Sequence, residues 1–357
     1  MCEEMATEMA DNGILSLKQE TVLLKDSIKL ERMKYADTTL KEASAKISDV
    51  SLVAPLQSMK TRKTLKHHLK VIAFDWSPDQ RHIYSGGEKG LTVIWDAFNS
   101  QEEIFIETDF ECVFSCAYAP STTLVACCGL SRRCSIYDVN CGVNFIKEPK
   151  KEFLLNSKYI THCVFVGSDQ QILTAGANTK IALWDMERPD PVCEFVGHKS
   201  EVMGVSLMQQ NSCSVFASCG NDRCVCIWDI RSGKCIRRID DYSSELNAVE
   251  FYSTGEAVAT AATDGTIRLF DFKADQEIML YAKPTILLAA SSLDFSKSGR
   301  ILFAGYDDNT LRAWDVLKGE QLSVWYDHED RISSVKVSPD GTAVGTCSWD
   351  STVRIWA

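Results

Sequence analysis

Several features are missing from this sequence of 357 residues, and each absence excludes a class of protein. No apolar run approaches the ~18 residues of a membrane helix, so no direct membrane insertion is expected. The sequence has no P-loop, no Gly-x-Gly-x-x-Gly after a strand, no His-Glu-x-x-His and no Gly-x-Ser-x-Gly. With only six histidines in addition, we expect no enzyme activity, no catalytic residues and no cofactor-binding residues.

Cysteine is abundant, but its pattern is unlike that of a metal or disulfide framework. The fifteen cysteines are an odd number, no Cys-x-x-Cys pair occurs, and no secretory leader is recognisable at Met1. We therefore expect reduced thiols in a cytoplasmic protein, mostly packed in strands, and no metal site. The net charge of −11 argues against a nucleic-acid partner and favours proteins.

An aromatic residue followed by aspartate recurs along the chain at spacings of 42 to 47 residues. The last copy ends in alanine instead, and each copy closes a short apolar run. The seven copies are Trp95-Asp96, Tyr137-Asp138, Trp184-Asp185, Trp228-Asp229, Phe270-Asp271, Trp314-Asp315 and Trp356-Ala357. This period is typical of WD40 repeats, so the sequence predicts an all-β, seven-bladed WD40 propeller with an N-terminal coiled-coil helix.

Two repeats carry a set of residues able to hydrogen-bond in series within one blade. Each set has a histidine, a hydroxyl, a turn aspartate and a tryptophan, and we interpret both sets as structural rather than catalytic. They are His198, Ser218, Asp222 and Trp228 in the fourth repeat, and His328, Thr346, Asp350 and Trp356 in the seventh.

The ends of the propeller predict how the ring closes. The last repeat stops at Trp356, the end of its third strand, so the seventh blade lacks an outer strand. Residues 59–66 precede the first repeat and are expected to supply it, which would place the propeller at 59–357 and cover a sheet edge.

The segment before the propeller has a different pattern. Residues 1–13 are expected to be disordered, and residues 14–50 to form a coiled-coil helical segment with the seam Leu17, Leu24, Ile28 and Tyr35. A single helix with an exposed apolar seam is marginal in water, so it needs a partner. Self-dimerisation through the seam and packing of the helix back on the propeller are the alternatives.

A coiled-coil helix followed by seven WD40 repeats resembles the β subunits of heterotrimeric G proteins. The similar stretches are Lys60–Lys66 (KTRKTLK), Ser115–Pro120 (SCAYAP), Ala182–Asp185 (ALWD), Ser296–Arg300 (SKSGR), Ala304–Asp308 (AGYDD) and Ser348–Asp350 (SWD). Within the family the chain is most similar to the divergent fifth β subtype, through Met5–Glu8 (MATE), Leu302–Tyr306 (LFAGY), Asp315–Gly319 (DVLKG), Val337–Ala343 (VSPDGTA) and the terminal Ala357.

The resemblance implies a non-catalytic signalling scaffold. The protein would pair through its N-terminal helix with the γ-like (GGL) domain of an R7-class regulator of G-protein signalling and would modulate Gα signalling. It would be cytoplasmic and reach the inner face of the plasma membrane through that partner. The alternatives are a conventional β subunit with a prenylated γ chain, or a generic WD40 adaptor.

The resemblance also implies a Gα and effector face around the central channel. Its positions here are Leu69, Lys70, Cys112, Phe114, Leu130, Tyr159, Glu201, Met203, Glu245, Asn247 and Trp349. Four positions depart from the family pattern: Cys112 replaces a tryptophan, Phe114 a methionine, Arg132 an asparagine and Thr263 an aspartate. Loss of an interface tryptophan can cost ~2 kcal/mol or more, so weak binding of GDP-loaded Gα is expected.

Overall fold

The computed structural model describes residues 21–24, 26–27, 56, 59–66, 69–155, 158–208 and 214–357. The chain divides into two compact units, Met1–Val50 and Ser51–Ala357. In the first unit, residues 21–24 and 26–27 are helical. Among the described residues, no helix is long and apolar enough to span a membrane.

The second unit is a ring of seven blades, each with four antiparallel strands, which confirms the predicted fold class. Blade 1 contains β2 (Val71–Trp76), β3 (His82–Gly87), β4 (Leu91–Asp96) and β5 (Glu102–Glu107). Blade 2 contains β6 (Val113–Tyr118), β7 (Leu124–Gly129), β8 (Arg133–Asp138) and β10 (Lys151–Leu154). Blade 3 contains β11 (Ile160–Phe165), β12 (Gln171–Gly176), β13 (Lys180–Asp185) and β14 (Cys193–Val196).

The remaining blades repeat this order. Blade 4 contains β15 (Val202–Leu207), β16 (Val215–Gly220), β17 (Val225–Asp229) and β18 (Lys234–Ile239). Blade 5 contains β19 (Leu246–Phe251), β20 (Ala257–Ala262), β21 (Ile267–Asp271) and β22 (Gln276–Tyr281). Blade 6 contains β23 (Ala290–Phe295), β24 (Ile301–Tyr306), β25 (Leu311–Asp315) and β26 (Gln321–Trp325). Blade 7 contains β27 (Ile332–Val337), β28 (Val344–Ser348), β29 (Thr352–Trp356) and β1 (Thr61–Lys66).

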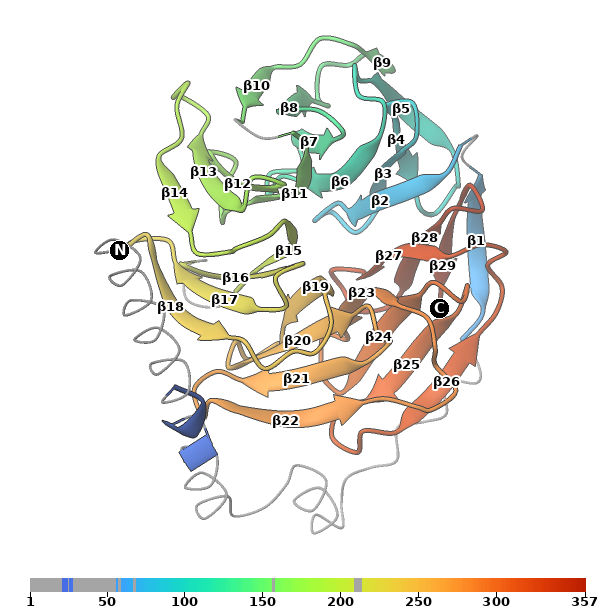
Figure 1. Cartoon of the computed structure of the whole chain (residues 1–357). Coiled ribbons are helices and arrows are strands. Elements are labelled where there is room, and N and C mark those ends of the chain that lie inside the picture. Colours follow the sequence, from blue (N-terminus) through green and yellow to red (C-terminus); the bar gives the residue numbers. More distant parts are fainter. Residues whose placement is uncertain are drawn as a thin grey trace, which may run out of the picture. The chain divides into compact units, whose positions relative to one another are not determined.

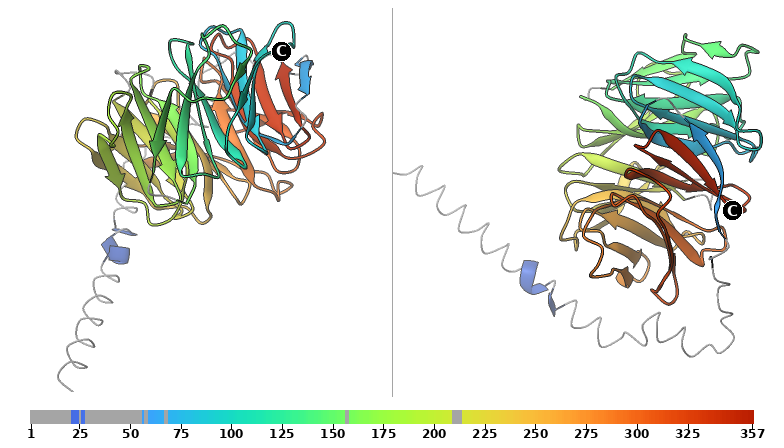
Figure 2. Two further views of the ribbon diagram at one scale, coloured as in Figure 1. Left: turned by 90° about the horizontal axis from the view of Figure 1, so that it is seen from above. Right: turned by 90° about the vertical axis from the view of Figure 1, so that its right-hand side faces the viewer.

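The first strand of each blade lies nearest the central axis, and the fourth lies outside (Figure 1). Figure 2 shows the ring from two further sides, with the strands running between its two faces. The hydrophobic clusters lie between neighbouring blades: one joins Ile136 of blade 2 to Trp184 of blade 3, and another joins Trp76 of blade 1 to Ile355 of blade 7. Because each middle strand is covered on both sides, strands such as β7 (LVACCG) are buried throughout.

The outer strand of blade 7 comes from the other end of the propeller sequence. β1 runs antiparallel to β29, with Leu65 opposite Val353, and Leu65 is only 1% exposed. The Thr61 hydroxyl donates to Asp327 at 2.6 Å, and Arg62 Nε donates to the Ala357 carbonyl at 2.9 Å. These contacts join the two ends of the propeller sequence, so blade 7 is closed by a strand from outside its own repeat.

One strand crosses between blades. The connection from β8 to β10 in blade 2 contains β9 (Phe145–Ile146), which pairs in parallel with β5 of blade 1. The spacing of 47 residues between the second and third repeats is the longest in the chain, and it accommodates this extra strand.

Candidate protein-binding site

The residues expected on the Gα and effector face lie on one face of the ring. Most of them immediately precede an innermost strand or are its second residue: Lys70, Cys112, Phe114, Tyr159, Glu201, Met203, Glu245 and Asn247. Leu130 and Trp349 follow β7 and β28, whose last residues pair with the first residues of β6 and β27. We call this set, with Leu69, the channel rim.

Trp349 is the most strongly held aromatic side chain of the channel rim. The Arg331 guanidinium carbon lies 3.3 Å from the centroid of its ring, and Lys70 Nζ lies 4.3 Å from it. Lys70 Nζ also lies 3.6 Å from Glu88 Oε1. Each cation–π contact contributes about 0.5–2 kcal/mol, so the indole is fixed before any partner arrives. Arg331 is absent from the positions that the sequence analysis singled out.

A second part of the rim spans blades 2 to 4. Phe114 and Tyr159 meet edge to face with their ring centroids 6.0 Å apart. Burial and a hydrogen bond to the Glu201 carboxylate raise the pKa of Tyr159 to about 12. Asn221 Nδ2 donates to Glu201 Oε2 at 3.2 Å. Aromatic side chains held among polar ones are the composition of a protein-binding surface.

Cys112 is partly buried between blades 1 and 2, where its backbone forms a bridge with Glu88. Burial and the negative charge of Glu88 raise the pKa of its thiol to about 11, so the side chain is neutral near pH 7. At this rim position the thiol therefore offers a small apolar contact rather than a nucleophile.

The other rim residues differ in exposure. Leu130 is 45% exposed and Glu245 is exposed, so both are open to a partner. Asn247 Nδ2 donates to the Ala290 carbonyl at 2.8 Å and so links blade 5 to blade 6. Asn247 and Met203 also line the central cavity, whose volume of about 180 Å³ is below the ~300 Å³ typical of small-molecule sites. A protein surface fits this face better than a small ligand does.

The predicted hydrogen-bonding sets are assembled in blades 4 and 7. In blade 4, His198 Nε2 lies 2.7 Å from Ser218 Oγ, His198 Nδ1 lies 3.0 Å from Asp222 Oδ1, and Trp228 Nε1 donates to Ser218 Oγ at 2.8 Å. Asp222 Oδ2 also accepts the backbone N–H of Lys199 at 2.8 Å. The set therefore holds the loop that leads directly to Glu201 on the rim.

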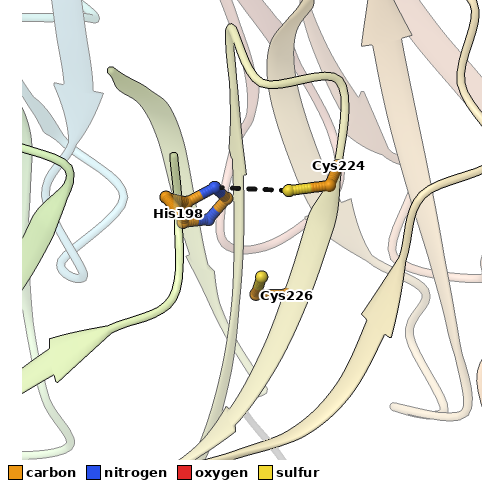
Figure 3. Close-up of side chains that lie close together, drawn as sticks. All are labelled: His198, Cys224 and Cys226. Atoms are coloured by element: carbon orange, nitrogen blue, oxygen red, sulfur yellow. Dashed lines mark hydrogen bonds between the residues drawn. The ribbon is translucent and has the colours of Figure 1, made fainter. Parts of the chain in front are cut away.

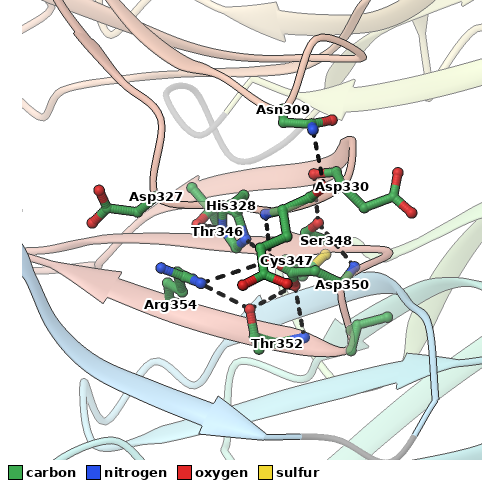
Figure 4. A network of polar contacts seen from close by, with 12 residues as sticks. Asn309, Asp327, His328, Asp330, Thr346, Cys347, Ser348, Asp350, Thr352 and Arg354 are labelled. Atoms are coloured by element: carbon green, nitrogen blue, oxygen red, sulfur yellow. Dashed lines mark hydrogen bonds and ion pairs between the residues drawn. The ribbon is translucent and has the colours of Figure 1, made fainter.

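Blade 7 has the same arrangement (Figure 4). His328 Nδ1 lies 2.7 Å from Asp350 Oδ2, His328 Nε2 lies 2.7 Å from Thr346 Oγ1, and Trp356 Nε1 donates to Thr346 at 2.8 Å. Although burial opposes it, hydrogen bonds from His328 and Thr352 hold the pKa of Asp350 well below its ordinary value. Asp350 also accepts the Glu329 N–H at 3.2 Å, so this set positions the loop that carries Arg331.

The predicted coiled-coil seam is described only at Leu24, which is 55% exposed next to exposed Val22 and Leu23. The helical residues 21–24 and 26–27 are consistent in type with the expected segment. Leu17, Ile28 and Tyr35 lie outside the described residues.

Seven four-strand repeats, each closed by an aromatic residue, and the histidine–aspartate sets of blades 4 and 7 define a WD40 propeller with a protein-binding face. The family model described as "G protein beta WD-40 repeat protein" matches residues 11–357, so the chain belongs to the G protein β subunit family. Members of this family are non-enzymatic signalling scaffolds.

Relatives from three organisms agree with this assignment. The chain is 40% identical over 301 residues to guanine nucleotide-binding protein subunit beta-5b of Danio rerio, an alignment covering 84% of this chain and 76% of the relative. It is 37% identical to subunit beta-2 of Caenorhabditis elegans, with 98% and 94% covered. It is 31% identical to the beta subunit of Saccharomyces cerevisiae, with 97% and 90% covered.

Proposed function

We propose that this G protein β subunit pairs through its N-terminal helix with the γ-like domain of an R7-class regulator of G-protein signalling. The partner supplies GTPase acceleration and attachment to the inner face of the plasma membrane, and the complex modulates Gα signalling. The observation that carries the proposal is the exposed apolar run Val22-Leu23-Leu24 in a helix, because such a run requires a partner to be buried. The similarity to subunit beta-5b and the fifth-subtype motifs support this class of partner.

The channel rim is the proposed surface for Gα and effectors. Trp349, fixed by Arg331 and Lys70, is its anchor, and Tyr159 with Glu201 forms a second contact region. The small Cys112 stands where the family resemblance implies a tryptophan, which removes apolar contact area. This loss favours a regulator-bound role over tight binding of GDP-loaded Gα.

The second candidate is a conventional β subunit with a prenylated γ chain. The near-complete alignments with the nematode beta-2 and yeast beta subunits favour it. In both candidate functions the same helix binds the partner. They differ in whether that partner is a γ-like domain or a prenylated γ chain.

Identification of the stoichiometric partner after purification of the full chain from its native tissue separates the two. A γ-like domain inside a larger regulator is the expected result, and a small prenylated chain would contradict it. Leu24→Asp combined with Ile28→Asp should abolish pairing, because two carboxylates in the seam would be buried without partners. Asp26→Ala on the same helix is the matched control and should keep the partner. A soluble, partner-bound double variant would refute pairing through this seam.

A further inference from the structure

Blade 4 departs from a pattern that the three following blades share. In those blades the turn aspartate is followed by a threonine two residues later and an arginine four residues later: Asp264, Thr266 and Arg268; Asp308, Thr310 and Arg312; Asp350, Thr352 and Arg354. In each of them the threonine hydroxyl donates to the aspartate. In blade 4 the corresponding residues after Asp222 are Cys224 and Cys226.

This departure places two thiols beside an imidazole. A ring nitrogen of His198 and the sulfurs of Cys224 and Cys226 lie within 4.8 Å of one another, the only such histidine, cysteine and carboxylate group found in the described part of the chain. Figure 3 shows these three side chains close together. All three are buried, with exposures of 5%, 1% and 0%. His198 is 26 residues from Cys224 in sequence, so only the folding of the blade brings them together.

The separation of the donor atoms fits a tetrahedral metal ion. Cys224 Sγ lies 3.6 Å from His198 Nδ1. With a Zn–N distance of about 2.05 Å, a Zn–S distance of about 2.3 Å and a tetrahedral angle, the two donors would be about 3.6 Å apart. Two thiolates and an imidazole are the soft ligands that zinc prefers in proteins. We propose that His198, Cys224 and Cys226 form a structural site for Zn²⁺ inside blade 4.

The charges around the site favour a divalent cation. Arg238 lies between two carboxylates: its Nε donates to Asp240 Oδ1 at 2.7 Å, and its Nη2 lies 3.5 Å from Asp222 Oδ2. Arg238 Nη1 lies 4.0 Å from Cys226 Sγ. With Cys224 and Cys226 ionised, the buried group would carry two uncompensated negative charges, which one Zn²⁺ neutralises.

A third thiol lies beside the site on the outer strand of the blade. Cys235 on the outer strand β18 is exposed and hydrogen-bonds with Cys226. Cys235 is not among the donor atoms that lie within 4.8 Å of one another, so its side chain would have to move to fill the fourth position of the ion.

Metal binding is compatible with the hydrogen bonds of the blade. Each of the two ligand thiols releases one proton as its sulfur binds zinc. With Nδ1 bound to zinc, the neutral imidazole of His198 carries its proton on Nε2, and this N–H can donate a hydrogen bond to Ser218 Oγ, 2.7 Å away. A second group that holds the free nitrogen of a ligand histidine is common at zinc sites. Asp222 keeps the Lys199 N–H and the Arg238 guanidinium as partners.

The test is titration of the reduced full-length chain with Co²⁺, followed by displacement with Zn²⁺. We expect one equivalent of Co²⁺ to produce a thiolate-to-cobalt charge-transfer band that Zn²⁺ abolishes. Cys224→Thr with Cys226→Ser, which restores the threonine of blades 5 to 7, should weaken Zn²⁺ binding at least about 100-fold. Cys141→Ser with Cys193→Ser removes two thiols elsewhere and should leave the titration unchanged.

Two results would overturn the zinc site. One is the lack of a one-equivalent band in the parent chain, and the other is an equal band in the Cys224→Thr, Cys226→Ser variant. If that variant does not fold, Cys226→Ser alone provides the test, because loss of one of two ligand thiolates should lower the band to about half. An unchanged band in this single variant would also refute the site.

Discussion

The guanidinium of Arg331 lies against the indole of Trp349, 3.3 Å from the ring centroid, although the two residues belong to different loops of blade 7. The backbone N–H of Trp349 also donates to the Arg331 carbonyl at 3.2 Å. The loop before β27 is held in turn by Asp350, which accepts the Glu329 N–H. The buried histidine–aspartate set and the half-buried Trp349 of the rim are thus linked through one loop.

Replacement of Trp349 by alanine should weaken binding of a Gα or effector partner while the propeller stays folded. An interface tryptophan contributes about 2 kcal/mol or more, which corresponds to a loss of about 30-fold in affinity. Calorimetry measures the affinity for the Gα or effector partner, and thermal unfolding of the variant without that partner measures its stability. Phe98→Ala is the control, because Phe98 is 67% exposed and follows β4 at the other face. A large fall in melting temperature would instead place Trp349 in the core.

Asp350→Asn should destabilise blade 7 by about 2 kcal/mol at pH 7, because charge-assisted hydrogen bonds from His328 and Thr352 are weakened. The folded-state pKa of Asp350 is depressed, so its contribution is complete above the unfolded value of 3.8 and is lost as the pH falls below it. The parent should therefore lose more stability than the variant between pH 5 and about pH 2. Melting temperatures across this range, recorded for both proteins, test the difference, and parallel curves would contradict it.

Leu65→Ala should weaken closure of the ring. Leu65 of β1 is buried in the hydrophobic cluster shared by blades 1 and 7. Truncation of such a side chain to alanine lowers the free energy of unfolding by about 2–5 kcal/mol. Partial release of β1 would also expose the edge of β29 to other chains. We expect a lower unfolding midpoint and faster aggregation by light scattering. Thr64→Ala, at an exposed position on the same strand, should change neither.

Asp294→Asn should stabilise the propeller at alkaline pH. Burial and the nearby Glu250 raise the pKa of Asp294 to about 7, against the attraction of Lys336. A carboxyl with a raised folded-state pKa loses stability as the pH rises from its unfolded value of 3.8 through about 7. The variant should therefore melt higher than the parent at pH 8 and about equally at pH 4.

Asp340→Asn is the control with the opposite sign, because hydrogen bonds from Ser338 and Thr342 lower the pKa of Asp340 to about 2. It should lose stability at pH 8 relative to the parent. Identical pH profiles for both variants would contradict the raised pKa of Asp294 in the folded state.

Much of the architecture can be predicted from a short sequence pattern that occurs seven times. The regular return of an aromatic residue at the end of an apolar strand predicts the number of blades, and the fold class is confirmed. The family is also readable from short stretches such as Ser115–Pro120. The parallel pairing of β9 with β5 was not predicted, because two residues of a connecting segment carry no periodic signal.

The sequence by itself determined the ring of blades, because strand periodicity and turn residues depend on neighbours a few positions away. Only the tertiary structure decided which side chains meet: Arg331 with Trp349, and His198 with Cys224 and Cys226. In each pair of segments, one is the loop before the innermost strand of a blade and the other is the hairpin of its second and third strands. The two segments meet only when the blade is folded. Such distances are set by packing of the whole blade, which no single stretch of sequence encodes.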